Sequence, residues 1–308
     1  MRPAWSSPAL SRKSASATMV KAVQTSVAPP SAQGAPGNTS TLFVSSFAKG
    51  LRVLEAFDLG HRSLSLSQLA EVSGIDKSAV QRFTYTLHAL GYLHKDPITK
   101  HYSLGPKTLQ LGSTYLRSDE LVERAHPILA EYSNALGETI NLARIDETDI
   151  VYLIRMPSRH PVSVDIMLGT RLPVFCSAMG RAMLAFMPND EMQALLGRST
   201  LESFTPHTVT DPTDLQKRLA DARRDRFVIT DQEIHIGDVS IAAPVFDHTG
   251  RVTAGIGFAV PKSRWSVKRV RRKLAPLVLH LAQTLSVQSP GSDWARDMRV
   301  LAAAALTE

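Results

Sequence analysis

Residues 65–90 read SLSQLAEVSGIDKSAVQRFTYTLHAL, and their pattern predicts two helices joined by a turn. Apolar side chains at positions 66, 69, 70 and 72 predict a short helix that begins at Ser65 or Ser67 and ends at Gly74. Asp76 then caps a second helix, predicted over residues 77–90, whose apolar side chains recur at helical spacing. Two helices joined by a short turn containing glycine are typical of a helix-turn-helix.

The flanking residues complete a small domain around this pair of helices. Before it, apolar side chains at positions 47, 51, 54 and 57 predict a helix that follows a serine cap. After it, residues 92–95 and 100–104 predict two strands joined by a turn at residues 96–99. The sequence therefore predicts a winged helix-turn-helix DNA-binding domain over residues 41–105.

The helix predicted over residues 77–90 has a polar face that suits contact with double-stranded DNA. In a helix-turn-helix, the N-terminal residues of the second helix face base edges in the major groove. Gln81 suits adenine and Arg82 suits guanine, because each side chain can bond its base at two points. Contacts to phosphates, which position the protein without reading sequence, are predicted for Lys77, Ser78 and Tyr85 on the helix and for Lys95, Lys100 and His101 on the hairpin.

The composition agrees with an anionic partner. The chain has 308 residues, a formal net charge of +7 and a pI of about 9.6. Residues 1–40 contain four Lys or Arg side chains and no Asp or Glu, and residues 41–105 contain seven basic against five acidic side chains. A continuous apolar run of about 18 residues is absent, so we expect no membrane-spanning helix. The single cysteine, Cys176, fits a reducing compartment, and we expect a cytoplasmic protein.

The two ends of the chain are predicted to be tails. Residues 1–40 are rich in Ser, Ala and Pro and predict a disordered segment. Two alternatives remain open: an acid-free leader is also typical of an organelle transit peptide, and Met19 is a second candidate start. Residues 288–308 are predicted to be a C-terminal tail.

The remaining two thirds predict a connecting helix and an α+β domain. Residues 106–137 have helical periodicity, with a dip at residues 117–119. From residue 138 to residue 287 the period changes to two, which predicts strands and an antiparallel sheet. Strands are expected at residues 139–145, 150–155, 162–166, 227–229, 239–246 and 252–260, and helices at residues 180–187, 211–225 and 266–285.

Two long motifs in this second domain resemble the IclR family of bacterial transcriptional regulators. They are residues 169–185, GTRLPVFCSAMGRAMLA, and residues 237–247, GDVSIAAPVFD. The resemblance covers residues 42–287, with both domains in the expected order. Residues 43–47, 208–212 and 231–234 resemble the branch of the family that regulates aromatic-acid catabolism, such as protocatechuate or 4-hydroxybenzoate degradation.

The resemblance implies a GAF-like effector domain that binds a small carboxylate metabolite, and homodimers or tetramers bound to a palindromic operator. Carried over by motif, the implied effector site contains Ala178, Met179, Thr230, Asp231, Ser240, Gly257 and Ala259. Family members often have an acid at position 230 and serines at positions 257 and 259, so these departures imply a roomier, less polar pocket. From the residues themselves, Arg155 and Arg171 are candidates to bind a carboxylate, because Arg can do so at two points.

Two alternatives come from other functional classes. Cys176 precedes a predicted helix start, which can lower a thiol pKa, so a cytosolic enzyme with Cys176 as nucleophile is the rival hypothesis. No motif places a base beside it, and His207, His235 and His248 lack metal-ligand spacing, so we predict no catalytic residue, metal or cofactor. A dimeric scaffold that binds DNA without sequence preference is the third possibility.

Overall fold

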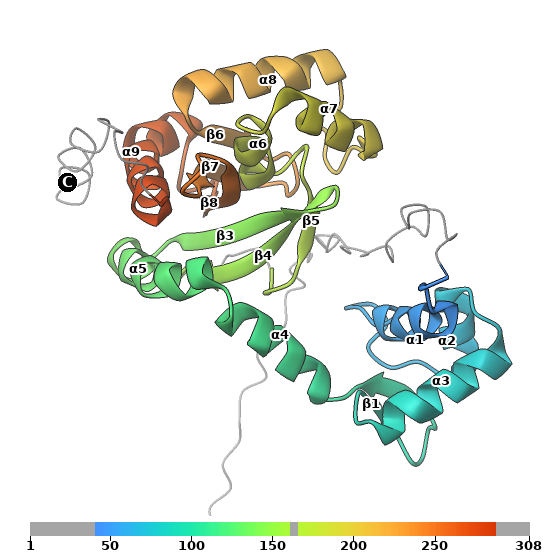
Figure 1. Cartoon of the computed structure of the whole chain (residues 1–308). Coiled ribbons are helices and arrows are strands. Elements are labelled where there is room, and N and C mark those ends of the chain that lie inside the picture. The colour runs from blue at the N-terminus through green and yellow to red at the C-terminus, as the bar shows by residue number, and fades with distance from the viewer. Residues whose placement is uncertain (1–40, 161–165, 288–308) are drawn as a thin grey trace, which may run out of the picture.

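The computed structural model describes residues 41–160 and 166–287, which form a small helical domain and a larger sheet domain (Figure 1). The small domain contains α1 (Ser45–Glu55), α2 (Leu66–Ser73), α3 (Lys77–Ala89), β1 (Leu93–Lys95) and β2 (Tyr102–Leu104). β1 and β2 pair antiparallel, with Leu93 opposite Leu104. This arrangement confirms the predicted winged helix-turn-helix. The two predicted tails, residues 1–40 and 288–308, lie outside the described residues.

Local interactions fix the ends of α2 and α3. Ser65 and Gln68 form a reciprocal cap, in which the Ser65 hydroxyl accepts from the Gln68 amide at 3.3 Å and the Gln68 side chain accepts from the Ser65 amide at 2.9 Å. Gly74 ends α2 with a φ of 65°, a left-handed conformation that glycine adopts without strain. Asp76 begins α3 by accepting from the Ala79 amide at 2.9 Å.

We expect Ser65→Ala to lower the stability of the small domain by about 1 kcal/mol, because the Gln68 amide loses its acceptor. A loss of that size shifts the melting temperature of a domain this small by about 4–8 °C. Ser67→Ala is the matched control, since Ser67 is exposed within α2. Thermal melting followed by circular dichroism measures both, and equal melting temperatures for the two variants would contradict the capping role.

One expectation about α1 was wrong. A serine was expected to cap the helix, but Ser45 is already its first helical residue and the flanking residue Val44 offers no side-chain bond. The apolar side chains of α1 also differ in burial: Val53 is fully buried, whereas Phe47 and Leu51 are exposed. Apolar periodicity therefore located this helix without showing which of its side chains reach the domain core.

The segment between the domains is two helices rather than one. α4 (Lys107–Arg117) is followed by α5 (Glu120–Leu136), and the break falls at the predicted dip. Asp119 causes it by accepting hydrogen bonds from the Leu121 and Val122 amides, which begins a new helix. The Asp119 carboxylate also pairs with Arg144 of the sheet domain, which fixes the start of α5 to that domain. α4 lies between the two domains in Figure 1.

The sheet domain, residues 120–287, is built on six antiparallel strands in the order β5-β4-β3-β8-β7-β6. They are β3 (Thr139–Asp146), β4 (Asp149–Met156), β5 (Arg171–Pro173), β6 (Val228–Asp231), β7 (Asp238–Phe246) and β8 (Val252–Pro261). β3, β8 and β7 form the centre, with Asn141 opposite Gly257 and Gly257 opposite Ala242. The α+β class is therefore confirmed.

Helices cover both faces of this sheet, as the alternation of buried side chains requires. α5 and α9 (Val267–Leu285) pack on one face, where Ile140, Leu142 and Phe258 join their core. α6 (Ala178–Leu184), α7 (Asn189–Arg198) and α8 (Pro212–Asp225) pack on the other, against Ala143 and Ala242. Gly255 allows the close approach of α6, because a Cβ there would lie 3.0 Å from Met179 atoms.

Four elements differ between the expectation and the structure. β5 and α7 were not predicted, because three strand residues give no period and the apolar residues of α7 are few. The helix expected at residues 180–187 begins earlier, at Ala178, because Ser177 caps it by accepting from the Gly180 amide at 3.1 Å. Of the strand expected at residues 162–166, residues 162–165 lie outside the described residues, and Ile166 is not in a strand.

Candidate functional site

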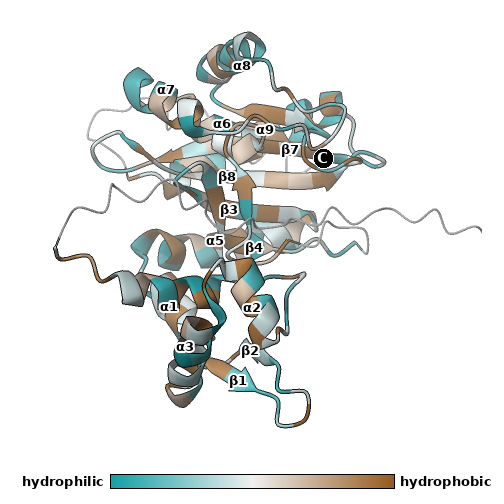
Figure 2. Ribbon diagram, turned by 90° about the vertical axis from the view of Figure 1, so that its right-hand side faces the viewer, coloured by the Kyte–Doolittle hydropathy of each residue, from teal (hydrophilic) through white to brown (hydrophobic). Residues whose placement is uncertain are grey.

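The polar face of α3 is exposed, as the helix-turn-helix hypothesis requires. Lys77, Ser78, Gln81, Arg82 and Tyr85 are all exposed, and Tyr85 retains 74% of its accessible surface. In the described part of the chain, neither Lys77 nor Arg82 forms a salt bridge. The Ser78 hydroxyl donates to the Asp76 carboxylate at 2.7 Å, and this bond is the main reason that the pKa of Asp76 is lowered. In the ribbon of Figure 2, much of α3 has the teal colour of hydrophilic residues.

The basic residues of the β1–β2 hairpin differ in how exposed they are to solvent. Lys100 is exposed at the tip with a φ of 61°, and its ammonium group donates to the Pro97 carbonyl at 2.6 Å. Lys95 lies over the Tyr102 ring at 5.3 Å and is half-buried, as is His101. Asp96 holds the turn by accepting from the amides of residues 98 and 99. The tip of the wing thus presents Lys100 most openly.

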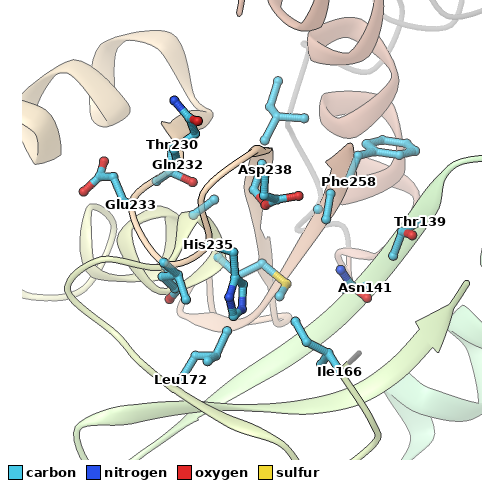
Figure 3. Close-up of a pocket in the computed structure, with 18 of the residues that line it drawn as sticks. Thr139, Asn141, Ile166, Leu172, Thr230, Gln232, Glu233, His235, Asp238 and Phe258 are labelled. Carbon is cyan, nitrogen blue, oxygen red and sulfur yellow. The ribbon is translucent and has the colours of Figure 1, made fainter. Parts of the chain in front are cut away.

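The sheet domain contains a pocket of about 350 Å³ on the face that α6 covers (Figure 3). One row of side chains across the sheet lies on its wall, because Thr139 of β3, Ala259 of β8, Ser240 of β7 and Thr230 of β6 are register neighbours. The start of α6 and the loop at residues 232–237 close other sides of the pocket.

Seven of the nine predicted effector residues line this pocket: Arg155, Ala178, Met179, Thr230, Ser240, Gly257 and Ala259. Gly257 and Ala259 leave the wall without bulky side chains, as the departures from the family pattern implied. Ala178 and Met179 belong to the first turn of α6, where backbone amides are not used by the helix itself.

The other two predicted residues lie elsewhere and have other partners. Arg171 is in β5, and its guanidinium group pairs with Asp146 at 2.5 Å and with Asp149 at 3.1 Å. The register of β4 and β5 causes the second pairing by placing Asp149 beside this strand. Asp231 ends β6, and its carboxylate pairs with Lys262 at 2.8 Å. Neither residue lines the pocket, so we leave both out of the proposed effector site.

Arg155 and Asp238 bring opposite charges to the pocket. The Arg155 guanidinium group donates to the Asn141 side chain at 3.3 Å. Asp238 accepts from the Ser240 hydroxyl at 2.8 Å. Burial raises the pKa of Asp238 to about 6, although the Ser240 hydrogen bond and the positive charge of Arg155 oppose the rise. The carboxyl group therefore titrates near neutrality.

Two further polar side chains line the pocket. Burial raises the pKa of Tyr152, so its hydroxyl group is neutral and able to donate. Burial lowers the pKa of His235, which favours the neutral ring. Its Nε2 atom is buried and has no hydrogen-bond partner among the described residues. Figure 3 shows this ring between Leu172 and Asp238.

A buried ion pair anchors the loop that carries His235. Arg181 of α6, which is 1% exposed, donates from both terminal nitrogens to the Glu233 carboxylate at 2.6 Å. The Arg181 Nε donates to the Phe175 carbonyl at 2.5 Å, and Glu233 also accepts from the Val209 amide at 3.1 Å. These bonds tie the wall of the pocket to α6.

The surroundings of Cys176 speak against the enzyme hypothesis. Its side chain is fully buried, lies 3.9 Å from the Pro173 carbonyl oxygen and does not line the pocket. Burial raises the pKa of the thiol to about 12, so the thiolate that a nucleophile needs is disfavoured.

Within residues 41–160 and 166–287, no three His, Cys, Asp or Glu side chains gather closely enough to hold a metal ion. In the same part of the chain, no helix is both long and apolar enough to cross a bilayer.

Sequence reasoning missed most of the polar wall of the pocket, including Asn141, Tyr152, Glu233, His235 and Asp238. The strand alternation was a usable signal for Asn141, because it places Asn141 on the face opposite Ile140 and Leu142. No comparable signal existed for His235, since its approach depends on the turn that the Asp238 amide closes by donating to the His235 carbonyl at 3.2 Å.

Comparison with known protein families covers nearly all of the described chain. The family model described as the IclR helix-turn-helix domain matches residues 46–97. The model described as the bacterial transcriptional regulator IclR C-terminal domain matches residues 113–287. Among curated relatives, the Pca regulon regulatory protein of Pseudomonas putida is 35% identical over 247 residues, which are 80% of this chain and 84% of that protein.

Solved structures resemble the whole fold. A crystal structure described as that of a transcriptional regulator from Rhodococcus sp. RHA1 has a TM-score of 0.71 and 32% identity, and the match covers 79% of this chain and 97% of that chain. An IclR homologue from Microbacterium hydrocarbonoxydans, solved with 4-hydroxybenzoate, has a TM-score of 0.67 and 24% identity over 78% of this chain and 97% of that chain. The chain therefore belongs to the IclR family of ligand-responsive, DNA-binding transcriptional regulators.

Proposed function

We propose that this regulator controls a catabolic operon and that its effector is a small aromatic or other carboxylic acid. The observation that carries the proposal is the pocket of about 350 Å³, large enough for a small acid. Arg155 is the only Lys or Arg among the described residues that line it. Arg recognises carboxylates with two parallel hydrogen bonds, so we assign the effector carboxylate to Arg155.

Two relatives support the aromatic class. The homologue from Microbacterium hydrocarbonoxydans is bound to 4-hydroxybenzoate, and the relative from Pseudomonas putida is named for the Pca regulon. The pocket of this chain has an apolar part that suits a ring, formed by Ile166, Leu172 and Met179. A planar ring can lie against these side chains while its carboxylate contacts Arg155.

We also propose that the regulator acts as a homodimer or tetramer on a double-stranded operator. Phe47 and Leu51 of α1 and Leu109, Leu111 and Tyr115 of α4 are exposed. The segment leading into α1 is hydrophobic as well (Figure 2). Large apolar side chains that stay exposed are typical of protein interfaces. Effector binding would then change the relative placement of two DNA-reading domains through α4, by favouring one placement over the other.

The test is binding of the purified full chain to DNA from its own upstream region, with random DNA as competitor and across a range of salt. Protocatechuate, 4-hydroxybenzoate and related acids are added in turn. Specific binding that one acid alters is the expected result. Specific binding that no acid alters would contradict the effector class, and equal competition by random DNA would contradict a specific operator.

Two arginine variants test whether effector binding depends on the arginine in the pocket or equally on one outside it. We expect Arg155→Gln to weaken the affinity for the active acid about tenfold or more, because a charge-assisted hydrogen bond contributes about 1.5–3 kcal/mol. Arg171→Gln is the matched control, since Arg171 lies outside the pocket and pairs with Asp146 and Asp149. Isothermal titration with each variant measures the effect. Equal losses in both variants would contradict the role of Arg155.

A further inference from the structure

Two polar side chains in the pocket wall each carry a donor group that bonds to none of the described residues. They are Asn141 of β3 and Tyr152 of β4, which line the pocket and are 3% and 6% exposed. Figure 3 shows Asn141 at the pocket wall. A buried polar group that lacks a partner costs free energy, so a molecule that supplies an acceptor to these groups gains affinity.

The orientation of the Asn141 amide follows from its neighbour. The Arg155 guanidinium group donates to the Asn141 Oδ1 atom at 3.3 Å. A guanidinium group has no acceptor, so the amide atom that faces it is the oxygen and not the nitrogen. The Nδ2 group is therefore turned away from Arg155, and no hydrogen bond joins it to another described residue. Asn141 thus offers the pocket a donor whose direction is fixed.

The Tyr152 hydroxyl group also remains a donor. Burial raises its pKa, and the negative charge of Asp238 raises it further, so the group keeps its proton at neutral pH. The charges that act on this hydroxyl belong to Asp238 and Arg155, which both line the pocket, so the hydroxyl lies near the pocket space. It forms no hydrogen bond to a described residue.

The strand register brings the two donors to neighbouring positions. Asn141 lies opposite Arg155, and Ala143 lies opposite Tyr152. Ala143 packs with the α6 side of the sheet, which is also the side of the pocket. Asn141 and Tyr152 are therefore diagonal neighbours on one face, a relation in which an aromatic side chain can reach its partner.

We propose that Asn141 and Tyr152 form a two-donor site that recognises an acceptor oxygen of the effector. This inference rests on the proposed effector class and names two residues that select within it. A carboxylate, phenol or carbonyl oxygen can accept from the Asn141 amide and from the Tyr152 hydroxyl. A molecule without an oxygen at that position leaves both donors unpaired, and the site rejects it for that reason.

Tyr152→Phe tests the hydroxyl, because it removes only the oxygen atom. Isothermal titration of the full chain with 4-hydroxybenzoate and with protocatechuate should show binding weakened about fivefold or more for the acid that wild-type protein binds. The melting temperature of the unliganded variant should stay equal or rise, since the hydroxyl has no partner among the described residues. Tyr132→Phe is the matched control, because Tyr132 is half-buried on α5 outside the pocket and should keep the wild-type affinity.

Asn141→Asp tests the amide, because it keeps an oxygen for Arg155 and replaces the donor with a second oxygen. Binding of the same acid should weaken about tenfold or more. Asn134→Asp is the matched control, since the Asn134 Oδ1 atom accepts from Arg159 at 3.1 Å in the same way but outside the pocket. This control should keep the wild-type affinity.

Three results would overturn the inference while leaving the effector class intact. They are a wild-type affinity in Tyr152→Phe, a lower melting temperature in that variant without ligand, and equal losses of affinity in the pocket variants and their controls. Wild-type protein that binds neither acid would contradict the aromatic effector class and the inference with it. If Asn141→Asp does not fold, the affinity and melting temperature of Tyr152→Phe decide.

Discussion

Replacement of Arg181 by methionine is expected to lower the free energy of unfolding of the sheet domain by about 3–5 kcal/mol. Arg181 and Glu233 are 1% and 7% exposed, and their two hydrogen bonds are both 2.6 Å long. Without the guanidinium group, the Glu233 carboxylate stays buried with the Val209 amide as its remaining donor. The unmatched charge, rather than the lost contact, accounts for most of the expected loss.

Urea unfolding followed by the fluorescence of Trp265 measures this loss, because Trp265 is buried in the sheet domain and its indole donates to Glu138 at 2.9 Å. Arg181→Lys is the first control: it keeps the charge but cannot bond at two points, so a smaller loss is expected. The double variant Arg181→Met with Glu233→Leu is the second control. It removes both charges and should recover much of the stability.

Two results would contradict this account. An Arg181→Met protein that unfolds at the wild-type urea concentration would show that the pair does not stabilise the domain. A double variant no more stable than Arg181→Met would show that the buried charge is not the cause. The pair also fixes the loop at residues 232–237, which forms part of the pocket wall. Arg181→Met should therefore weaken effector binding as well as lower stability.

The helix-turn-helix could be predicted from sequence because its determinants are local. Ser65 with Gln68, Gly74 and Asp76 each act within four residues of their own position, and each has the role that its residue type favours. The exposure of Phe47 and Leu51 could not be predicted in the same way. Periodicity gives a helical face, but it does not say whether that face packs inside the chain or against a partner.

The pocket was predicted in outline for a different reason. The family motifs place Ser240, Gly257 and Ala259 on adjacent strands, and the antiparallel register then brings them to one wall. Arg171 and Asp231 show the limit of this reasoning. Each lies close to a predicted site in sequence, yet each has an ion-pair partner that only the tertiary structure supplies, Asp149 in one case and Lys262 in the other.

Asp238 shows the converse limit, because a motif residue became informative only through its surroundings. Its position beside Ser240 was visible in the sequence. Its charge became significant once the fold placed it in the wall of the same small pocket as Arg155 and removed it from water. The partners of a charged side chain in a pocket can therefore be inferred only once the fold is known. The same holds for its effect on a ligand.

Arg82→Ala is expected to weaken operator binding by about 1–3 kcal/mol and to leave binding to random DNA nearly unchanged. Arg82 is exposed on α3, six residues after the cap at Asp76, and forms no salt bridge within the described residues. Its guanidinium group is thus available to contact a guanine edge at two points, which is the source of the expected discrimination.

Lys77→Ala separates base reading from charge, since Lys77 begins α3 and is predicted to contact phosphate. That variant should bind operator and random DNA more weakly by similar factors, and the slope of log affinity against log salt should fall by about 1. Titrations of both variants against operator and random DNA at several salt concentrations distinguish the two roles. An Arg82→Ala protein that loses equal affinity for both DNAs would show that Arg82 contacts the DNA backbone. Gln81 would then be the residue expected to recognise a base.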